Sequence, residues 1–278
     1  MQKRHKVFLH IFVAIGILLI IFILWQLSIA IPTSADWWPE LAVLSTAEFD
    51  NNLVTVKNVR NFRYEGENVY PDYYDETYDL NKLVRVWYIS EPFKNFDIAA
   101  HTFLSFEFSD KKFLSVTIEA RKKNGQDYSL LRGMLRTYPL MYIAADERDS
   151  VLVRTNTRKS DVYMYPVKLS SIEKGRELMV DVLERMNSLA TNPKWYKTFS
   201  ANCTSSIAYH VNRISPGRLP YFPWQVWITG YADRLALERG LLDTNLTLEE
   251  AREKYYITKK SRQIGDVENF SELIRQFD

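Results

Sequence analysis

Residues 101–121 read HTFLSFEFSDKKFLSVTIEAR, a stretch that has the pattern of a β-hairpin. Its two halves, 101–108 and 112–121, are rich in β-branched and aromatic residues, and a short polar turn separates them. Polar and apolar residues alternate along parts of both halves, as in paired antiparallel strands with one buried face. The stretch therefore predicts two neighbouring antiparallel strands.

The short turn sets the register of this predicted hairpin. If Phe108 pairs with Lys112, then His101 lies opposite Glu119. A carboxylate beside an imidazole fixes its tautomer and stabilises the imidazolium, which is the third role in a catalytic triad. The alternatives are a polar cross-strand pair on a solvated face and pairing of Glu119 with nearby Arg121. The register is self-consistent, because it also pairs Leu104 with Val116, Phe106 with Leu114, and Ser105 with Ser115.

Strand patterns come first along the chain and helix patterns later. The Tyr- and Asp-rich residues 70–79 predict a surface loop, and after Pro166 the hydrophobic period becomes helical. Ser170 and Glu173 have the spacing of a capping box, and Pro193 ends the helix that follows. This order predicts an α+β domain with a mostly antiparallel sheet. Strands are predicted at 53–59, 84–90, 101–108, 112–121, 140–145, 150–155 and 161–167, and the helical stripe comprises Leu178, Val182, Met186 and Leu189.

The N-terminus predicts a membrane anchor. Residues 7–25 are apolar apart from His10, long enough at helical rise to cross one hydrocarbon core, and they follow the basic stretch MQKRHK. The alternative is a cleaved signal peptide, but LSIAIPTSA fits a cleavage site poorly. The charge bias predicts a single-pass inner-membrane protein with its N-terminus in the cytoplasm. The expected organisation is a cytoplasmic N-terminus at 1–6, an anchor at 7–31, a linker and domain entry at 32–57, and a periplasmic domain at 58–278.

Charge and composition exclude several classes of function. The 278 residues hold 36 basic and 34 acidic side chains, so the part beyond the basic N-terminus is near neutral and nothing in it indicates a nucleic-acid partner. The sequence has no Gly-rich phosphate loop and no internal repeat. An abundance of aromatic residues predicts a sizeable core.

The chain has one cysteine, Cys203, in FSANCTSSIAYHV (199–211). Asn202 before it is a good helix N-cap, so the thiol is expected in the first turn of a helix. The positive end of the helix and its unpaired N–H groups favour a thiolate and can hold an oxyanion. The alternatives are a small buried apolar side chain and, because the envelope is oxidising, a redox thiol acting between chains.

A nucleophilic thiolate normally needs an imidazole, and the chain offers four histidines. His5 and His10 lie before and within the predicted anchor. His210 is seven residues beyond Cys203, roughly 10 Å along one helix. His101 therefore remains as the candidate base, with a structural histidine at a strand start as the alternative.

Several blocks resemble a known family. In order they are HTFLSFEF, SVTIEARK, ADERD, LVRTNTR, YKTFSANCTSSI and GYADRLALERGLLDT, and they resemble the domain family that forms the N-terminal periplasmic part of Lnb, the lipoprotein N-acyltransferase. The resemblance implies a permuted papain-like fold in which the His strand precedes the Cys helix. It also implies Cys203 as the nucleophile, His101 as the base and Glu119 as the polar residue on the following strand.

The remaining charged and aromatic blocks carry weaker indications. Residues 146–149 (DERD) predict a buried Arg–carboxylate brace rather than a metal site. Arg154 and Arg158 are candidates to bind a phosphate or carboxylate on a substrate, with a solvated strand face as the alternative. Residues 215–227 (SPGRLPYFPWQVW) are a candidate lid or acyl groove, with packing under a loop as the alternative.

The sequence and the family resemblance together predict a membrane-anchored cysteine acyltransferase or hydrolase acting on lipid or lipoprotein acyl groups, and the resemblance implies that it is papain-like. In this hypothesis Cys203 forms a thioester, His101 transfers the proton and Glu119 orients His101, with no metal and no cofactor. One alternative is a peptidoglycan amidase or endopeptidase, which would use the same triad. The other is an envelope scaffold or binding module with a degenerate site.

Overall fold

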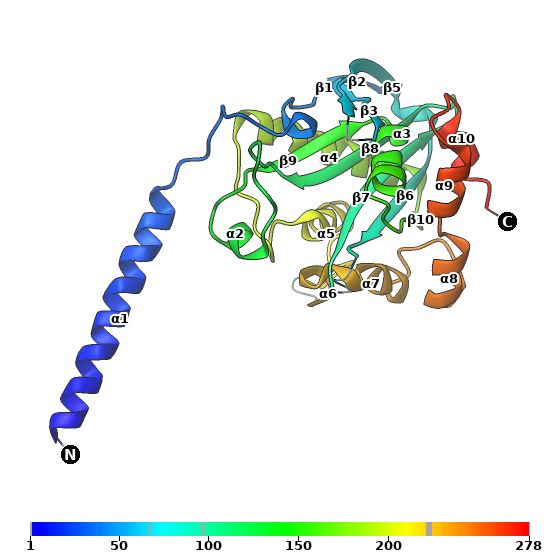
Figure 1. The fold of residues 1–278 in the computed structure, drawn as a ribbon. Coiled ribbons are helices and arrows are strands. Elements are labelled where there is room, and N and C mark those ends of the chain that lie inside the picture. Colours follow the sequence, from blue (N-terminus) through cyan, green and yellow to red (C-terminus); the bar gives the residue numbers. More distant parts are fainter. Residues whose placement is uncertain (1, 67, 95, 97, 221–223, 278) are drawn as a thin grey trace.

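The computed structural model describes residues 2–66, 68–94, 96, 98–220 and 224–277. An N-terminal helix, α1 (Gln2–Ser28), extends away from a mixed α/β body (Figure 1). Residues 5–28 of this helix are apolar and long enough to cross a membrane. The body contains a large sheet and several helices, as expected for an α+β domain.

The main sheet runs in the order β1-β2-β9-β8-β7-β6-β10, with β5 paired to β2. All but one of its strand pairings are antiparallel; β2 pairs with β9 in parallel. A small separate pair consists of β3 (Arg63–Glu65) and β4 (Asn68–Tyr70). The main strands are β1 (Thr46–Asp50), β2 (Leu53–Arg60), β5 (Tyr73–Asp79), β6 (Leu83–Pro92), β7 (Ala100–Phe108), β8 (Phe113–Ala120), β9 (Leu140–Ala145) and β10 (Tyr163–Pro166).

Helices cover both faces of this sheet. On one face, α4 and α5 pack on a cluster that includes Leu104, Val116 and Leu183. On the other face, α3, α9 and α10 pack around Phe103 and Ile89. The helices are α2 (Leu130–Met134), α3 (Glu147–Leu152), α4 (Ile172–Thr191), α5 (Cys203–Ile214), α6 (Trp224–Trp227), α7 (Ala232–Glu238), α8 (Leu248–Lys254), α9 (Thr258–Ile264) and α10 (Phe270–Ile274), with shorter helical turns at Pro39–Leu41, Leu80–Lys82 and Thr229–Tyr231.

The β7–β8 hairpin has the predicted register. Leu104 pairs with Val116 and Ser105 with Ser115, and the Phe108 N–H donates to Lys112 O at 3.0 Å. The face that carries the serines is not solvated, because Ser105 and Ser115 are fully buried beneath α3. The helical stripe of α4 is also confirmed, since its four predicted residues are buried.

Three local predictions are wrong. The capping box of Ser170 and Glu173 does not form, because the N-cap of α4 is Ser171 and its side chain makes no capping hydrogen bond. Residues 150–155 form the end of α3 and the start of a π-helical turn, Val153–Thr157, rather than a strand. Asp146 caps this helix by accepting from the Arg148 N–H, and buried ion pairs hold its charged first turn against the sheet. Residues 73–79 form β5 rather than a surface loop, because β2 supplies a pairing partner that sequence periodicity does not show.

Candidate active site

Cys203 is the first residue of α5, as expected for a capped helix start. The Asn202 side chain accepts from the Ser205 N–H at 2.7 Å, and the Ser205 hydroxyl accepts from the Asn202 N–H at 2.8 Å. The amide of Asn202 also donates to Thr198 O and Val226 O, so it fixes the loop before the helix. The first two N–H groups of a helix have no partner within it, and those of α5 therefore adjoin the thiol.

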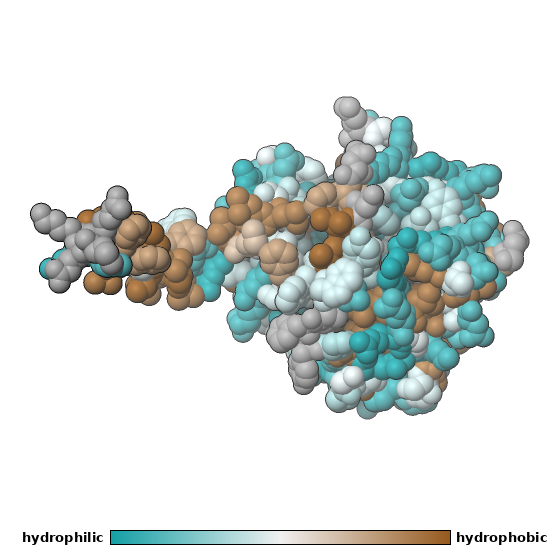
Figure 2. Space-filling view, turned by 90° about the horizontal axis from the view of Figure 1, so that it is seen from below, coloured by the Kyte–Doolittle hydropathy of each residue, from teal (hydrophilic) through white to brown (hydrophobic). Residues whose placement is uncertain are grey.

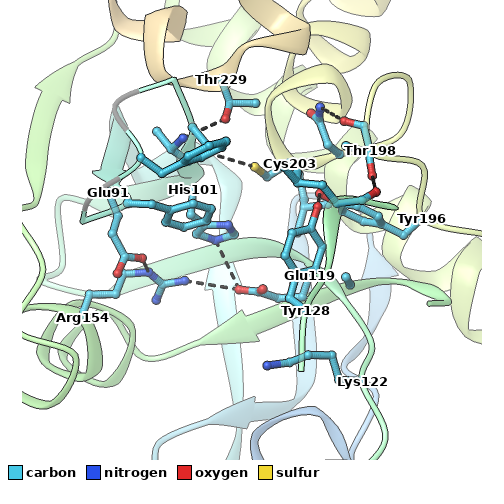
Figure 3. Close-up of a pocket in the computed structure, with 18 of the residues that line it drawn as sticks. Glu91, His101, Glu119, Lys122, Tyr128, Arg154, Tyr196, Thr198, Cys203 and Thr229 are labelled. Atoms are coloured by element: carbon cyan, nitrogen blue, oxygen red, sulfur yellow. Dashed lines mark hydrogen bonds and ion pairs between the residues drawn. The ribbon is translucent and has the colours of Figure 1, made fainter. Parts of the chain in front are cut away.

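The start of α5 meets the start of β7. Cys203 Sγ lies 3.8 Å from Ala100 O, and the hydroxyls of Thr102 and Thr204 are 3.0 Å apart. This packing brings the thiol close to His101, which lies next to Ala100 on β7, and each of the two side chains shifts the pKa of the other. Figure 3 shows the sulfur and the imidazole together at one wall of a cavity. The structure thus places the nucleophile and base candidates, about a hundred residues apart in the sequence, beside each other at one cavity.

Glu119 on β8 lies on the other side of the imidazole. Its Oε1 is 3.2 Å from His101 Nε2, and Arg121 points elsewhere, donating to the carbonyls of Leu41 and Ala42. The alternative pairing of Glu119 with Arg121 is therefore wrong. The cationic partner of Glu119 is Arg154, whose Nη2 lies 3.3 Å from the same Oε1.

Thr117 joins the imidazole to the carboxylate. Its hydroxyl donates to Glu119 Oε1 at 2.8 Å and lies 2.7 Å from His101 Nε2. A hydroxyl has one proton, and that proton goes to Glu119, so Nε2 must donate to Thr117. The second ring nitrogen, Nδ1, is then the basic one that is free to accept the thiol proton. Sequence reasoning missed Thr117, although the hairpin register placed it on the same face as His101 and Glu119.

The charges of His101, Cys203 and Glu119 shift one another's pKa values. Burial opposes the imidazolium, but the negative charges of Glu119 and Cys203 outweigh burial and raise the pKa of His101 to about 9. Burial favours the neutral thiol, but His101 outweighs it and lowers the pKa of Cys203 below its ordinary value. Burial also opposes the carboxylate, yet His101 and then Arg154 hold the pKa of Glu119 far below its usual range. These directions favour a thiolate–imidazolium pair near neutral pH.

A buried ion pair between Arg154 and Glu91 lies next to Glu119. Arg154 is almost fully buried, and its Nε lies 2.9 Å from Glu91 Oε2. Its guanidinium lies over the Phe103 ring at 4.4 Å and donates to Ser150 O at 2.6 Å. The solvated-face alternative is therefore wrong for Arg154, whereas Arg158 is 45% exposed and lies at the cavity.

The predicted Arg–carboxylate brace at residues 146–149 is confirmed. Arg60 donates to both carboxylate oxygens of Asp149, and Glu147 accepts from Arg275. Arg148 pairs with Asp266 at 2.9 Å. Within the part of the chain that the structure describes, no three His, Cys, Asp or Glu residues are grouped to hold a metal ion.

The triad candidates face a cavity of about 480 Å³, within the usual size of a small-molecule site. Figure 3 shows His101, Glu119 and Cys203 along one wall, with Arg154 beside Glu119. Polar and charged groups gather at this wall, and apolar side chains form much of the rest. The apolar lining includes Phe93, Phe96, Ile98, Leu130, Phe199 and Trp227.

The candidate lid at 215–227 is described only in part. Residues 221–223 lie outside the described residues. Trp224–Trp227 form α6, and Trp227 lines the cavity, while Leu219 and Val226 are buried against Leu235. In the described part, Leu219 and Val226 pack against the domain, whereas Trp227 lines the cavity.

A family model described as the Lnb N-terminal periplasmic domain matches residues 70–230. This match covers more than half of the chain. The chain belongs to this family. No curated protein and no solved structure matches it. As a member of the Lnb N-terminal domain family with one apolar N-terminal helix, the chain is a membrane-anchored periplasmic protein.

Proposed function

We propose that this protein is a thiol acyltransferase or hydrolase that acts on lipid or lipoprotein acyl groups through a thioester on Cys203. One observation carries the proposal: the thiol, the imidazole and a carboxylate 3.2 Å from that imidazole all line one cavity. In this proposal α1 crosses the inner membrane with its N-terminus in the cytoplasm. The proposal takes the helix-start thiol, packed on a sheet that carries the histidine, as the site of a permuted papain-like domain.

The first half of the reaction forms the thioester. The Cys203 thiolate attacks the acyl carbonyl carbon, and the carbonyl electron pair moves onto oxygen, where the first N–H groups of α5 stabilise it. When the tetrahedral intermediate collapses, the bond to the leaving alcohol or amine breaks. The His101 imidazolium gives its proton to that leaving group and becomes neutral.

The second half releases the acyl group. Neutral His101 takes a proton from an amine or a water molecule, which attacks the thioester carbonyl carbon. The carbon–sulfur bond breaks, and the electron pair returns to Cys203 as thiolate beside the imidazolium. Glu119 and Thr117 keep Nε2 protonated in both halves, so Nδ1 carries the moving proton.

The cavity favours an acyl chain over a polar peptide, because phenylalanine, leucine and isoleucine side chains line its mouth. The proposal is tested by mass spectrometry of membrane lipids and lipoproteins from cells that carry the wild-type chain or Cys203→Ala. We expect an acylated product or a lysolipid that depends on Cys203. Equal lipid and lipoprotein profiles, with muropeptide fragments that depend on Cys203, would instead establish a cell-wall hydrolase.

A further inference from the structure

We propose that the exported domain docks on the outer surface of the membrane that α1 crosses, through an apolar patch around the cavity mouth. The patch comprises Phe93, Phe96, Leu130, Leu131, Met134 and Phe199, each between 40 and 61% exposed. Its partner is the lipid leaflet itself. This inference concerns a surface and does not require that Cys203 be catalytic.

The patch is one surface made from three segments. Phe93 and Phe96 follow β6, Leu130 and Leu131 belong to α2, and Phe199 precedes α5. The Thr198 hydroxyl donates to Leu130 O at 2.8 Å, which joins the segment before α5 to α2. Phe93 and Phe96 line the same cavity as Leu130 and Phe199, so the segment after β6 lies beside the other two. Figure 2 shows apolar side chains gathered on this lower face, on the side where α1 leaves the domain. Monomeric soluble proteins rarely expose an apolar area of this kind without a partner.

The position of α1 identifies the bilayer as that partner. Arg136, two residues after α2, donates to Gln26 O at 3.1 Å, and Gln26 lies in the last turn of α1. The patch therefore adjoins the end of the anchor, where the membrane surface must lie. In Figure 1, α1 runs downward from the domain, and α2 and α6 lie on the same lower side.

The tether between α1 and the domain, residues 29–36, is too short to let the domain move far from the membrane. Eight residues, 29–36, separate Ser28 from Trp37, which pairs with Lys123 in the domain. Eight extended residues span at most about 28 Å, so the domain cannot move far from the leaflet. Trp38, the next residue, lines the cavity. The tether thus enters the domain beside the cavity and keeps the mouth near the lipid.

The test measures membrane depth on the full-length protein in proteoliposomes. In a Cys203→Ser background, Leu131→Cys and Phe199→Cys are each labelled with an environment-sensitive fluorophore. Leu53→Cys is the matched control, because Leu53 is also an exposed leucine, 44% exposed, at the β1–β2 turn on the opposite side of the domain. Nitroxide-labelled phospholipids then quench any label that lies within the leaflet.

We expect blue-shifted emission and strong lipid quenching at positions 131 and 199, and neither effect at position 53. Water-like emission at both patch positions would overturn the proposal, as would equal quenching at position 53. If a second copy of the chain covered the patch instead, emission would be blue-shifted without lipid quenching, and that result would also overturn it. Two patch positions keep the test decisive if one variant fails to fold.

Discussion

Oε1 of Glu119 lies 3.2 Å from Nε2 of His101, on the side of the imidazole away from Cys203. Because Glu119 is the largest favourable contribution to the raised pKa of His101, the account predicts a pH effect for Glu119→Gln. The amide keeps the shape but not the charge, so the pKa of His101 falls from about 9 toward its ordinary value. Activity needs the imidazolium as the acid, and the alkaline limb of kcat/KM should therefore move to lower pH. An unchanged alkaline limb would mean that Glu119 does not act through His101.

Thr117→Val should reduce kcat by roughly tenfold or more while leaving KM nearly unchanged, because the valine cannot accept from Nε2 and only Glu119, at 3.2 Å, then holds the tautomer. Thr117→Ser should restore most of the activity, since it keeps the hydroxyl. The measurement is steady-state kinetics with a soluble acyl ester. A valine variant as active as wild type would remove Thr117 from the site.

The thiol of Cys203 should react with iodoacetamide at neutral pH, and its rate should fall only as the pH drops below its lowered pKa. In His101→Ala, only the hydrogen bonds of Thr102 still oppose the effect of burial, so the pKa of Cys203 should rise and the reaction at neutral pH should slow. His210→Ala serves as the control histidine variant, because His210 contacts Asp181 and Tyr142 instead. Equal rates in wild type and His101→Ala would contradict the proposed ion pair.

Arg154→Leu should destabilise the fold strongly, by about 3–5 kcal/mol, because it leaves the buried Glu91 without its closest cation. Arg158→Leu is the matched control and should change stability little, since Arg158 is exposed and 3.9 Å from the same carboxylate. Urea unfolding of the two variants measures the difference. Similar losses in both would show that Arg154 is not a structural cation.

Leu131→Asp should lower turnover of an acyl donor held in a bilayer and leave turnover of a soluble acyl ester unchanged. The aspartate weakens contact with the leaflet without touching the cavity wall, because Leu131 is 61% exposed on α2. Leu53→Asp should change neither rate. A loss in both assays would point to misfolding, which circular dichroism would detect, and a loss in neither would contradict the docking surface.

Local pattern was sufficient to predict the parts of the site that lie close together in the sequence. A short turn joins β7 and β8, so pairing Phe108 with Lys112 fixed the position of Glu119 opposite His101. Asn202 signalled the helix start because N-capping is also local. The strand order favoured an α+β fold, although it could not show which strands would be neighbours.

The parts that sequence reasoning missed depend on distant partners. Arg154 lies in a run of β-branched residues that resembles a strand, but it belongs to a helical turn whose charges pair with Glu91 and Glu119. Residues 73–79 form a strand only because β2 lies beside them. The pairing of Cys203 with His101 was predicted, but only by elimination among the histidines and by the family resemblance, because no local pattern encodes the packing of α5 on β7.

The most direct test of the central claim is the intact mass of the purified full-length protein after brief incubation with an activated short-chain acyl ester. The account predicts one added acyl group on wild-type protein, mapped to Cys203 and removed by hydroxylamine, with none on Cys203→Ala and slow formation on His101→Ala. A folded wild-type protein that acquires no acyl group on Cys203, or acquires it equally fast without His101, would contradict the account.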